Sequence, residues 1–153
     1  MSAFATEVAK FRQWAIVRQS PDYSYKQYSH GAEWECDYPD WQQFYAAVDS
    51  FLGTAAHRVL TTDELEQLLY ALARDSEDEV ILKRLEQFEA VALQIAEAAL
   101  NYPDANARWQ TAVLMGRLGT PDAAAFLRRF LTDGAEYVRR RAGFALQELE
   151  ARA

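Results

Sequence analysis

The chain has 153 residues, half of them hydrophobic, and a formal net charge of −7. With only six glycines and four prolines, this composition excludes a disordered or low-complexity protein. Its length suits one domain, residues 1–153, that buries about 68–70% of its unfolded surface. Cys36 is the only cysteine, so no disulfide forms within the chain and we expect a reduced, cytoplasmic protein. The charges near the N-terminus and the short apolar runs predict no signal peptide and no membrane contact.

Acidic and basic side chains are unevenly distributed. Residues 61–104 contain eleven acidic and three basic side chains, whereas residues 105–153 contain eight arginines and five acidic side chains. An acidic surface repels phosphate backbones and attracts basic proteins. We therefore expect a protein partner with a basic surface and no nucleic acid, although solvated helix faces account for most charges of this kind.

The first predicted helix covers residues 3–19. Phe4, Val8 and Phe11 recur at helical spacing and form one apolar face. Pro21 ends this helix, because the residue before a proline disfavours helical geometry.

A loop rich in aromatic side chains, residues 20–39, follows the first helix. A connection of this length is uncommon in a compact helical domain and is often functional. It is either a partner-binding surface or a cap whose rings close the end of the helical stack. The loop residues proposed to bind a partner are Tyr23, Tyr25, Tyr28, Trp34 and Tyr38. A second proposed group is acidic and would steer a basic partner, and it comprises Asp75, Glu77, Asp78 and Glu79.

Helix-start signals divide the middle of the chain. Pro39 suits the first position of a helix that Gly53 can end. Thr61-x-x-Glu64 and Ser76-x-x-Glu79 both have capping-box spacing, in which two side chains satisfy free backbone N–H groups. Residues 78–101 keep one apolar phase and form either one long helix or two. We favour two, because helices average about 11–12 residues.

The C-terminal third repeats itself. Asp104 precedes a predicted helix that closes with Leu118-Gly119, Thr120-Pro121 begins a second, and a last helix covers about 135–151. Residues 31 positions apart correspond, pairing Ala107-Arg108, Thr111 and Leu114-Met115 with Val138-Arg139, Ala142 and Ala145-Leu146. A period of about 30 residues built from two short helices is typical of a helical solenoid.

This repeated sequence pattern resembles the HEAT-like repeats first noted around phycobilin lyases. That family's arginine near the start of the helix falls on Arg108 and Arg139, and its closing Leu-Gly falls on Leu118-Gly119. The resemblance is clearest over residues 104–149. It implies an all-α, HEAT-like right-handed α-solenoid of about seven or eight helices, and it implies an architecture rather than an activity.

The repeated arginines predict a structural ladder. Arg108 and Arg139 occupy equivalent positions, and we expect them to pair with the inter-helix acids Asp104 and Asp133. The alternative, a nucleic-acid patch around residues 139–141, is disfavoured because three consecutive helical residues spread over about 200°. Gly116 lies inside a predicted helix, where it costs about 1 kcal/mol relative to Ala, so we expect a neighbouring helix to approach it closely.

Catalytic and metal-binding patterns are weak. A metal site would have to use His30 with Glu33, Glu35, Cys36 and Asp37, whose spacing matches no structural zinc pattern. The surroundings of Cys36 are not basic enough to lower the pKa of its thiol. The sequence contains no glycine-rich phosphate loop, nucleophile elbow or zinc-protease motif. We therefore predict no catalytic residue, no metal and no cofactor.

Together these patterns favour a non-enzymatic protein–protein interaction module. Its most specific form would be an acidic immunity or inhibitor protein that neutralises a basic toxin or another protein. Two alternatives remain, a HEAT-like enzyme (a DNA-repair glycosylase or a chromophore lyase) and a structural subunit of a larger assembly. The sequence leaves open the identity of the partner and the choice between monomer and homodimer.

Overall fold

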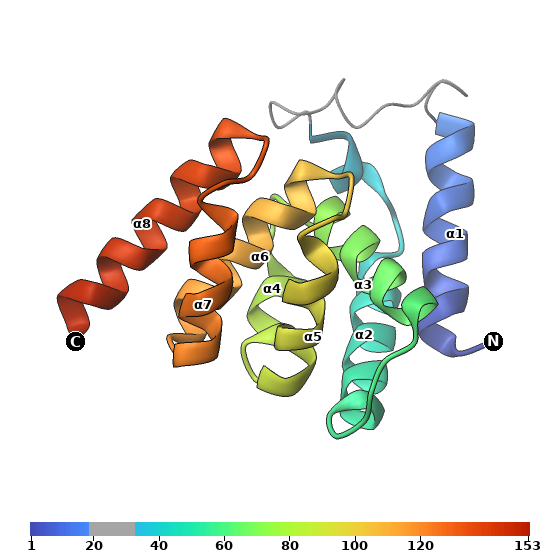
Figure 1. The fold of residues 1–153 in the computed structure, drawn as a ribbon. Helices are drawn as coiled ribbons and strands as arrows, with labels where there is room; N and C mark the ends of the chain where they lie inside the picture. The colour runs from blue at the N-terminus through green and yellow to red at the C-terminus, as the bar shows by residue number, and fades with distance from the viewer. Residues whose placement is uncertain (19–32) are drawn as a thin grey trace.

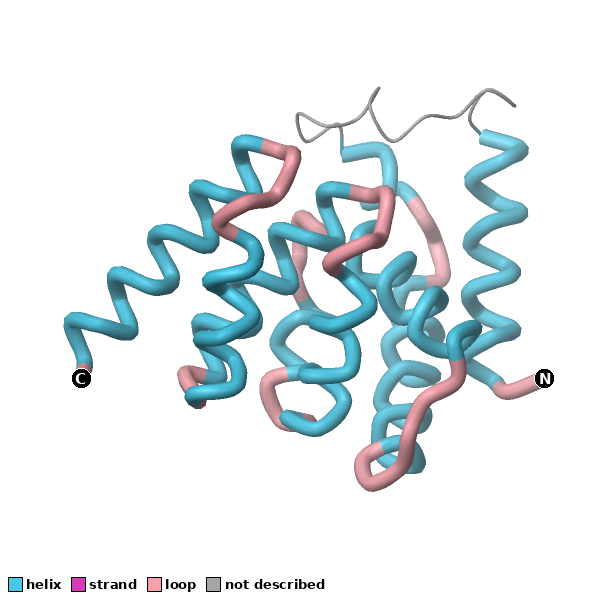
Figure 2. The backbone as a smooth tube through the Cα atoms, viewed as in Figure 1, coloured by secondary structure: helices cyan, strands magenta, loops and turns pink. Residues whose placement is uncertain are grey.

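The computed structural model describes residues 1–18 and 33–153, and these residues form helices and no strand (Figures 1 and 2). The elements in chain order are α1 (Ala3–Arg18), the 3-10 helix η2 (Glu33–Asp37), α2 (Trp41–Ala55), α3 (Thr62–Arg74), α4 (Val80–Leu85), α5 (Glu89–Ala99), α6 (Ala105–Leu118), α7 (Pro121–Phe130) and α8 (Glu136–Arg152). They follow one another across the molecule from α1 to α8 (Figure 1). The predicted all-α helical solenoid is confirmed.

Three of the predicted helix starts are confirmed by their capping hydrogen bonds. The Thr61 hydroxyl accepts from the N–H of Glu64, whose carboxylate accepts from the N–H of Thr61 in return. Asp104 caps α6 through the N–H of Asn106 at 2.9 Å. Thr120 caps α7, and Pro121 takes the first helical position, where no backbone N–H is needed.

Three other expectations about helix ends are wrong. The Ser76–Glu79 capping box does not form, because Glu79 itself precedes α4 in a left-handed conformation with φ of 54°. Pro39 does not begin α2, which starts at Trp41 after the N-cap Asp40. Gly53 does not end that helix, which continues to Ala55.

The preference for two helices within residues 78–101 is confirmed. α4 ends at Leu85, and α5 begins at Glu89 after a short turn. Both helices bury their apolar side chains in the same core, Ile81 and Leu85 from α4 and Ile95 from α5. A common core keeps the apolar phase continuous across a backbone break, and for this reason the sequence pattern alone does not reveal the turn.

The C-terminal half is organised around α6. This helix packs against α3 on one side and α8 on the other, while α5 and α7 also lie against it. Its buried face combines Leu114 and Met115 with the small residues Ala107 and Ala112. None of the helices in the described residues is both long and apolar enough to span a bilayer.

The helices α6 and α8 approach each other closely at Gly116. A Cβ atom placed on Gly116 would lie only 2.7 Å from the Cβ of Ala145. Two side-chain carbons do not approach so closely, so the helices keep this separation only while residue 116 lacks a side chain. The expected close approach at Gly116 is confirmed, and Gly116 also lines the groove described below.

Candidate functional site

The two aromatic rings in the described part of the loop, Trp34 and Tyr38, pack against the core. Trp34 stacks on Trp14 with ring centroids 5.8 Å apart, and Tyr38 meets Phe11 edge-on at 4.7 Å. Tyr38 is only 5% exposed, so the expectation that its ring anchors a partner is wrong. Trp34 is half-buried in the same cluster, so the cap interpretation describes residues 34–38 better. The other proposed anchors, Tyr23, Tyr25 and Tyr28, lie outside the described residues.

The acidic group divides between the core and the surface. Asp75 is 3% exposed, and its carboxylate accepts the Tyr45 hydroxyl at 2.6 Å and the N–H of Ile81 at 2.8 Å. Burial raises the pKa of Asp75 to about 6 despite these donors. Asp75 therefore fixes the turn between α3 and α4 and cannot steer a partner, a correction of the expected role. Glu77 and Asp78 are exposed, and Glu79 is half-buried.

One pair of the predicted arginine ladder, Arg108 with Asp133, is present, and it spans successive repeats. Arg108 holds Asp133 through two hydrogen bonds, from Nε to Oδ2 at 2.9 Å and from Nη2 to Oδ1 at 3.2 Å. Asp104 pairs with Arg74 of α3 and not with Arg108. Arg139 donates to the backbone carbonyl of Asp133 at 2.6 Å. Each inter-helix aspartate thus accepts an arginine from the preceding repeat and a backbone N–H near the start of the next helix.

Arg74 also joins this ladder to the aromatic cap. Its guanidinium lies between Asp104 and Glu35, with Nη1 3.4 Å from Oε1 of Glu35. Burial raises the pKa of Glu35 to about 8 and lowers the pKa of Arg74. The cluster ties η2, α3 and α6 together. Glu35 and Arg74 were missed as structural residues, because no local pattern reveals two partners that lie in different elements.

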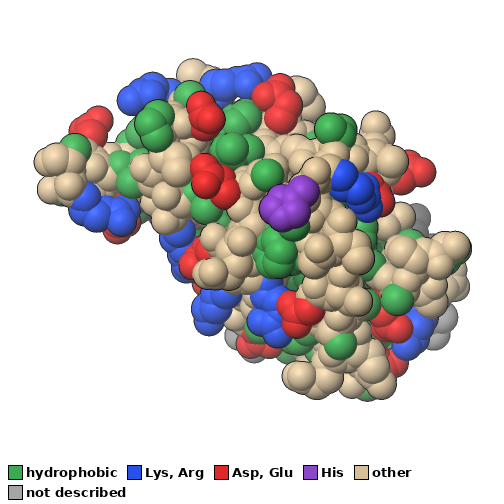
Figure 3. Space-filling view, turned by 90° about the horizontal axis from the view of Figure 1, so that it is seen from below, with side chains coloured by type: hydrophobic (Ala, Val, Ile, Leu, Met, Phe, Trp, Pro, Cys, Tyr) green, Lys and Arg blue, Asp and Glu red, His purple; other side chains and the backbone are tan. Residues whose placement is uncertain are grey.

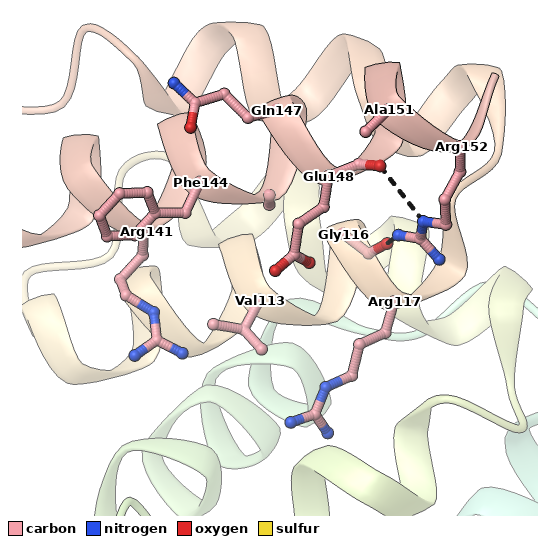
Figure 4. A pocket seen from close by; sticks show the side chains of 10 residues that line it. Val113, Gly116, Arg117, Arg141, Phe144, Gln147, Glu148, Ala151 and Arg152 are labelled. Atoms are coloured by element: carbon pink, nitrogen blue, oxygen red, sulfur yellow. Dashed lines mark hydrogen bonds between the residues drawn. The ribbon is translucent and has the colours of Figure 1, made fainter.

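An open groove of about 980 Å³ lies between α6 and α8. Seen from below, the part of the molecule that contains α8 projects from the body, and basic side chains border the recess beside it (Figure 3). Figure 4 shows Arg141 and Arg117 on either side of Val113, with Glu148 between the two helices. We call this surface the α6–α8 groove and define it by Val113, Arg117, Arg141, Phe144, Glu148 and Arg152.

Aromatic and arginine side chains extend the groove towards the N-terminal ends of its helices. Arg141 lies 5.0 Å above the ring centre of Trp109 and donates to the Tyr137 hydroxyl at 3.0 Å. Trp109 and Tyr137 meet edge-on with centroids 5.5 Å apart. Tyr137 is 42% exposed and Phe144 55% exposed. Tyr, Trp and Arg dominate the binding energy of protein interfaces, and here they form one surface that the sequence analysis did not identify.

A family model describing HEAT repeats matches residues 65–147, which is more than half of the chain. The chain belongs to the HEAT-repeat proteins. The match begins in α3, earlier than the C-terminal third in which the sequence pattern is clearest. No curated protein and no solved structure matches this HEAT-repeat protein.

HEAT repeats generally mediate protein–protein interactions. In this HEAT-repeat protein the matched residues include most of the α6–α8 groove, from Trp109 on α6 to Phe144 on α8. Among the residues that the structure describes, no three His, Cys, Asp or Glu side chains are grouped closely enough to hold a metal ion. The groove offers instead arginines, aromatic rings and an exposed apolar side chain, which suit the recognition of a polypeptide.

Proposed function

We propose that this HEAT-repeat protein acts without catalysis, by binding another protein in the α6–α8 groove. The observation that carries the proposal is Phe144. Its side chain is 55% exposed and lines the groove about one helical turn from Arg141, which itself contacts Trp109 and Tyr137. A large apolar side chain beside aromatic rings and arginines, all on one concave surface, is typical of a binding site.

The direct test is affinity capture with the purified protein as bait. We expect the parent protein to retain a specific polypeptide that Phe144→Ser does not retain. Val59→Ser is the matched control, because Val59 is an 85% exposed apolar residue that does not line the groove. Retention of the same polypeptide by all three baits would place the binding surface elsewhere. Unchanged thermal unfolding of Phe144→Ser would show that a loss of capture is a surface effect.

A second candidate is the acidic inhibitor of a basic protein, in the manner of an immunity protein. Its support is the net charge of −7 together with the exposed Glu77 and Asp78 in the turn between α3 and α4. That turn ends at Glu79, whose carboxylate lies 3.7 Å from Arg117 and so borders the groove. A basic partner would therefore meet this turn.

The second candidate predicts a strong salt dependence. Steering by exposed charges is screened beyond about 8 Å at physiological ionic strength, so association should slow as salt rises. Reversal of both charges, Glu77→Lys with Asp78→Lys, should slow association further. A captured partner whose association rate responds neither to the reversal nor to salt would exclude this candidate and leave the protein-binding function in place.

A further inference from the structure

Arg141 and Arg152 lie on nearly the same face of α8. They are eleven residues apart, which corresponds to about three turns and a rise of about 16 Å. Phe144 and Glu148 lie between them along the groove. The groove therefore has two guanidinium groups, one in the N-terminal half of α8 and one at its C-terminal end, with an apolar side chain and one carboxylate between them.

Both of these guanidinium groups lack a carboxylate partner within the described part of the chain. Arg141 contacts the Tyr137 hydroxyl and the Trp109 ring. Arg152 makes only long contacts with two backbone carbonyls, those of Glu148 at 3.3 Å and Gly116 at 3.4 Å. Arg117 differs, because it donates to Glu86 at 2.5 Å. An arginine without an acid is well placed to take a carboxylate from another molecule in a bidentate contact.

We propose that the α6–α8 groove binds an acidic amphipathic helix of the partner protein. Its two carboxylate side chains, about three turns apart, would pair with Arg141 and Arg152. An apolar side chain between them would pack on Phe144 and Val113. A helix suits this surface because side chains eleven positions apart recur on one helical face at the same rise of about 16 Å. Glu148 repels a third carboxylate, so the middle of the bound helix is apolar.

This inference rests on the proposed function and narrows the partner to a protein that presents an acidic amphipathic helix. The charge complementarity is local, because the whole protein carries −7 and would repel an acidic segment elsewhere. The basic-partner candidate predicts the opposite charge preference at the groove. The same set of peptides therefore separates the two.

The experiment uses three labelled helical peptides in fluorescence anisotropy. All have the same apolar face and differ in two residues eleven positions apart, which are Glu in one peptide, Gln in the second and Lys in the third. We expect the Glu peptide to bind about tenfold tighter than the Gln peptide, the gain from roughly 1.4 kcal/mol of added charge pairing. The double variant Arg141→Gln/Arg152→Gln should lose this preference and keep its affinity for the Gln peptide. Arg128→Gln, an exposed arginine of α7, should behave like the parent protein.

Other outcomes overturn the proposal in distinguishable ways. The three peptides could bind the parent protein equally and fail to bind Phe144→Ser. That result would keep the groove as a protein-binding site and show that it has no preference for acidic side chains. Tighter binding of the Lys peptide would favour the basic partner. If no peptide binds and sedimentation shows a dimer that Phe144→Ser dissociates, the occupant is a second copy of this chain. If no peptide binds to a monomer, the inference fails, and the capture experiment decides the proposed function separately.

Discussion

Arg108 and Asp133 join two successive repeats through a forked ion pair. Both contacting nitrogens of the guanidinium engage the two carboxylate oxygens, and Oδ1 of Asp133 also accepts the N–H of Ala135 at 2.8 Å. Nη1 of Arg108 donates to the carbonyl of Tyr102 at 2.7 Å. Arg108 therefore contacts both the segment that precedes α6 and the segment that follows α7. Among the described residues, Arg139 makes only the contact that corresponds to Arg108–Tyr102, because it donates to the backbone carbonyl of Asp133.

This difference predicts that Arg108 stabilises the fold more than Arg139. Arg108→Lys keeps the charge but loses the planar fork, and we expect it to lower the free energy of unfolding by about 1–3 kcal/mol. Arg139→Lys should cost less. Urea unfolding midpoints provide the measurement, with the exposed Arg128→Lys as control. A loss of partner binding by a fully stable Arg108→Lys would instead make this residue part of the binding site.

The close approach of Gly116 to Ala145 predicts that Gly116→Ala destabilises the protein, whereas helix propensity alone would predict stabilisation. Gly116→Ala should gain about 1 kcal/mol of propensity, yet it places two Cβ atoms 2.7 Å apart. Overpacking of this kind costs about 1–3 kcal/mol, and a Cβ atom held by its own helix cannot move aside cheaply. We expect net destabilisation in thermal unfolding.

A double-mutant cycle tests the cause. Ala145→Gly removes the opposing Cβ, so the combined variant should be more stable than the sum of the two single changes predicts. Gly53→Ala serves as the control of opposite sign, because its added Cβ in α2 would have no described neighbour within 4 Å outside the adjoining backbone of its own helix. It should stabilise the protein by up to about 1 kcal/mol. Additive single changes in the cycle would mean that α6 and α8 adjust freely at this point.

Leu127 and Leu131 provide a matched pair near the end of α7. Leu127 is fully buried, whereas Leu131 is 40% exposed. Leu127→Ala should lower the free energy of unfolding by about 2–5 kcal/mol, because it removes buried methyl groups and leaves a cavity. Leu131→Ala should cost distinctly less. Chemical denaturation measures both, and equal costs would contradict the packing of α7 described above.

The buried carboxylate of Glu35 predicts a dependence of stability on pH. Its pKa is about 8 in the folded protein, above the ordinary glutamate value of 4.5. A raised pKa means that the folded state holds the proton more tightly. The contribution of Glu35 to stability is therefore fully present below about pH 4.5 and is lost as pH rises towards 8.

Glu35→Gln should remove this component. We expect the stability of the parent protein relative to Glu35→Gln to decline between pH 5 and pH 8, as followed by urea midpoints at several pH values. Glu150→Gln is the control, because Glu150 is exposed in α8 and is not among the carboxylates that act on Glu35, so its replacement should leave the pH profile of the parent unchanged. A constant difference between parent and Glu35→Gln across this range would show that Glu35 is ionised throughout.

The sequence by itself determined the helical elements and the repeat. Thr61 with Glu64, Asp104 and Thr120 with Pro121 mark helix starts because capping depends on side chains only two or three residues away. The 31-residue period identified the solenoid because equivalent positions face equivalent neighbours. The same period singled out Arg108 and Asp133, of which the structure shows the pair, but it did not reveal that Asp104 pairs with Arg74. Gly116 predicted a close helix contact because glycine inside a helix is costly unless a neighbouring helix approaches it.

Tertiary structure alone decided which of these side chains are free to act. Tyr38 and Asp75 fit a binding surface by residue type, yet both are buried by residues remote in sequence, Phe11 for the ring and Tyr45 for the carboxylate. Phe144 fits a core position by residue type, yet it borders an open groove. Exposure depends on how α6 and α8 pack, and that packing depends on contacts between residues far apart in the sequence.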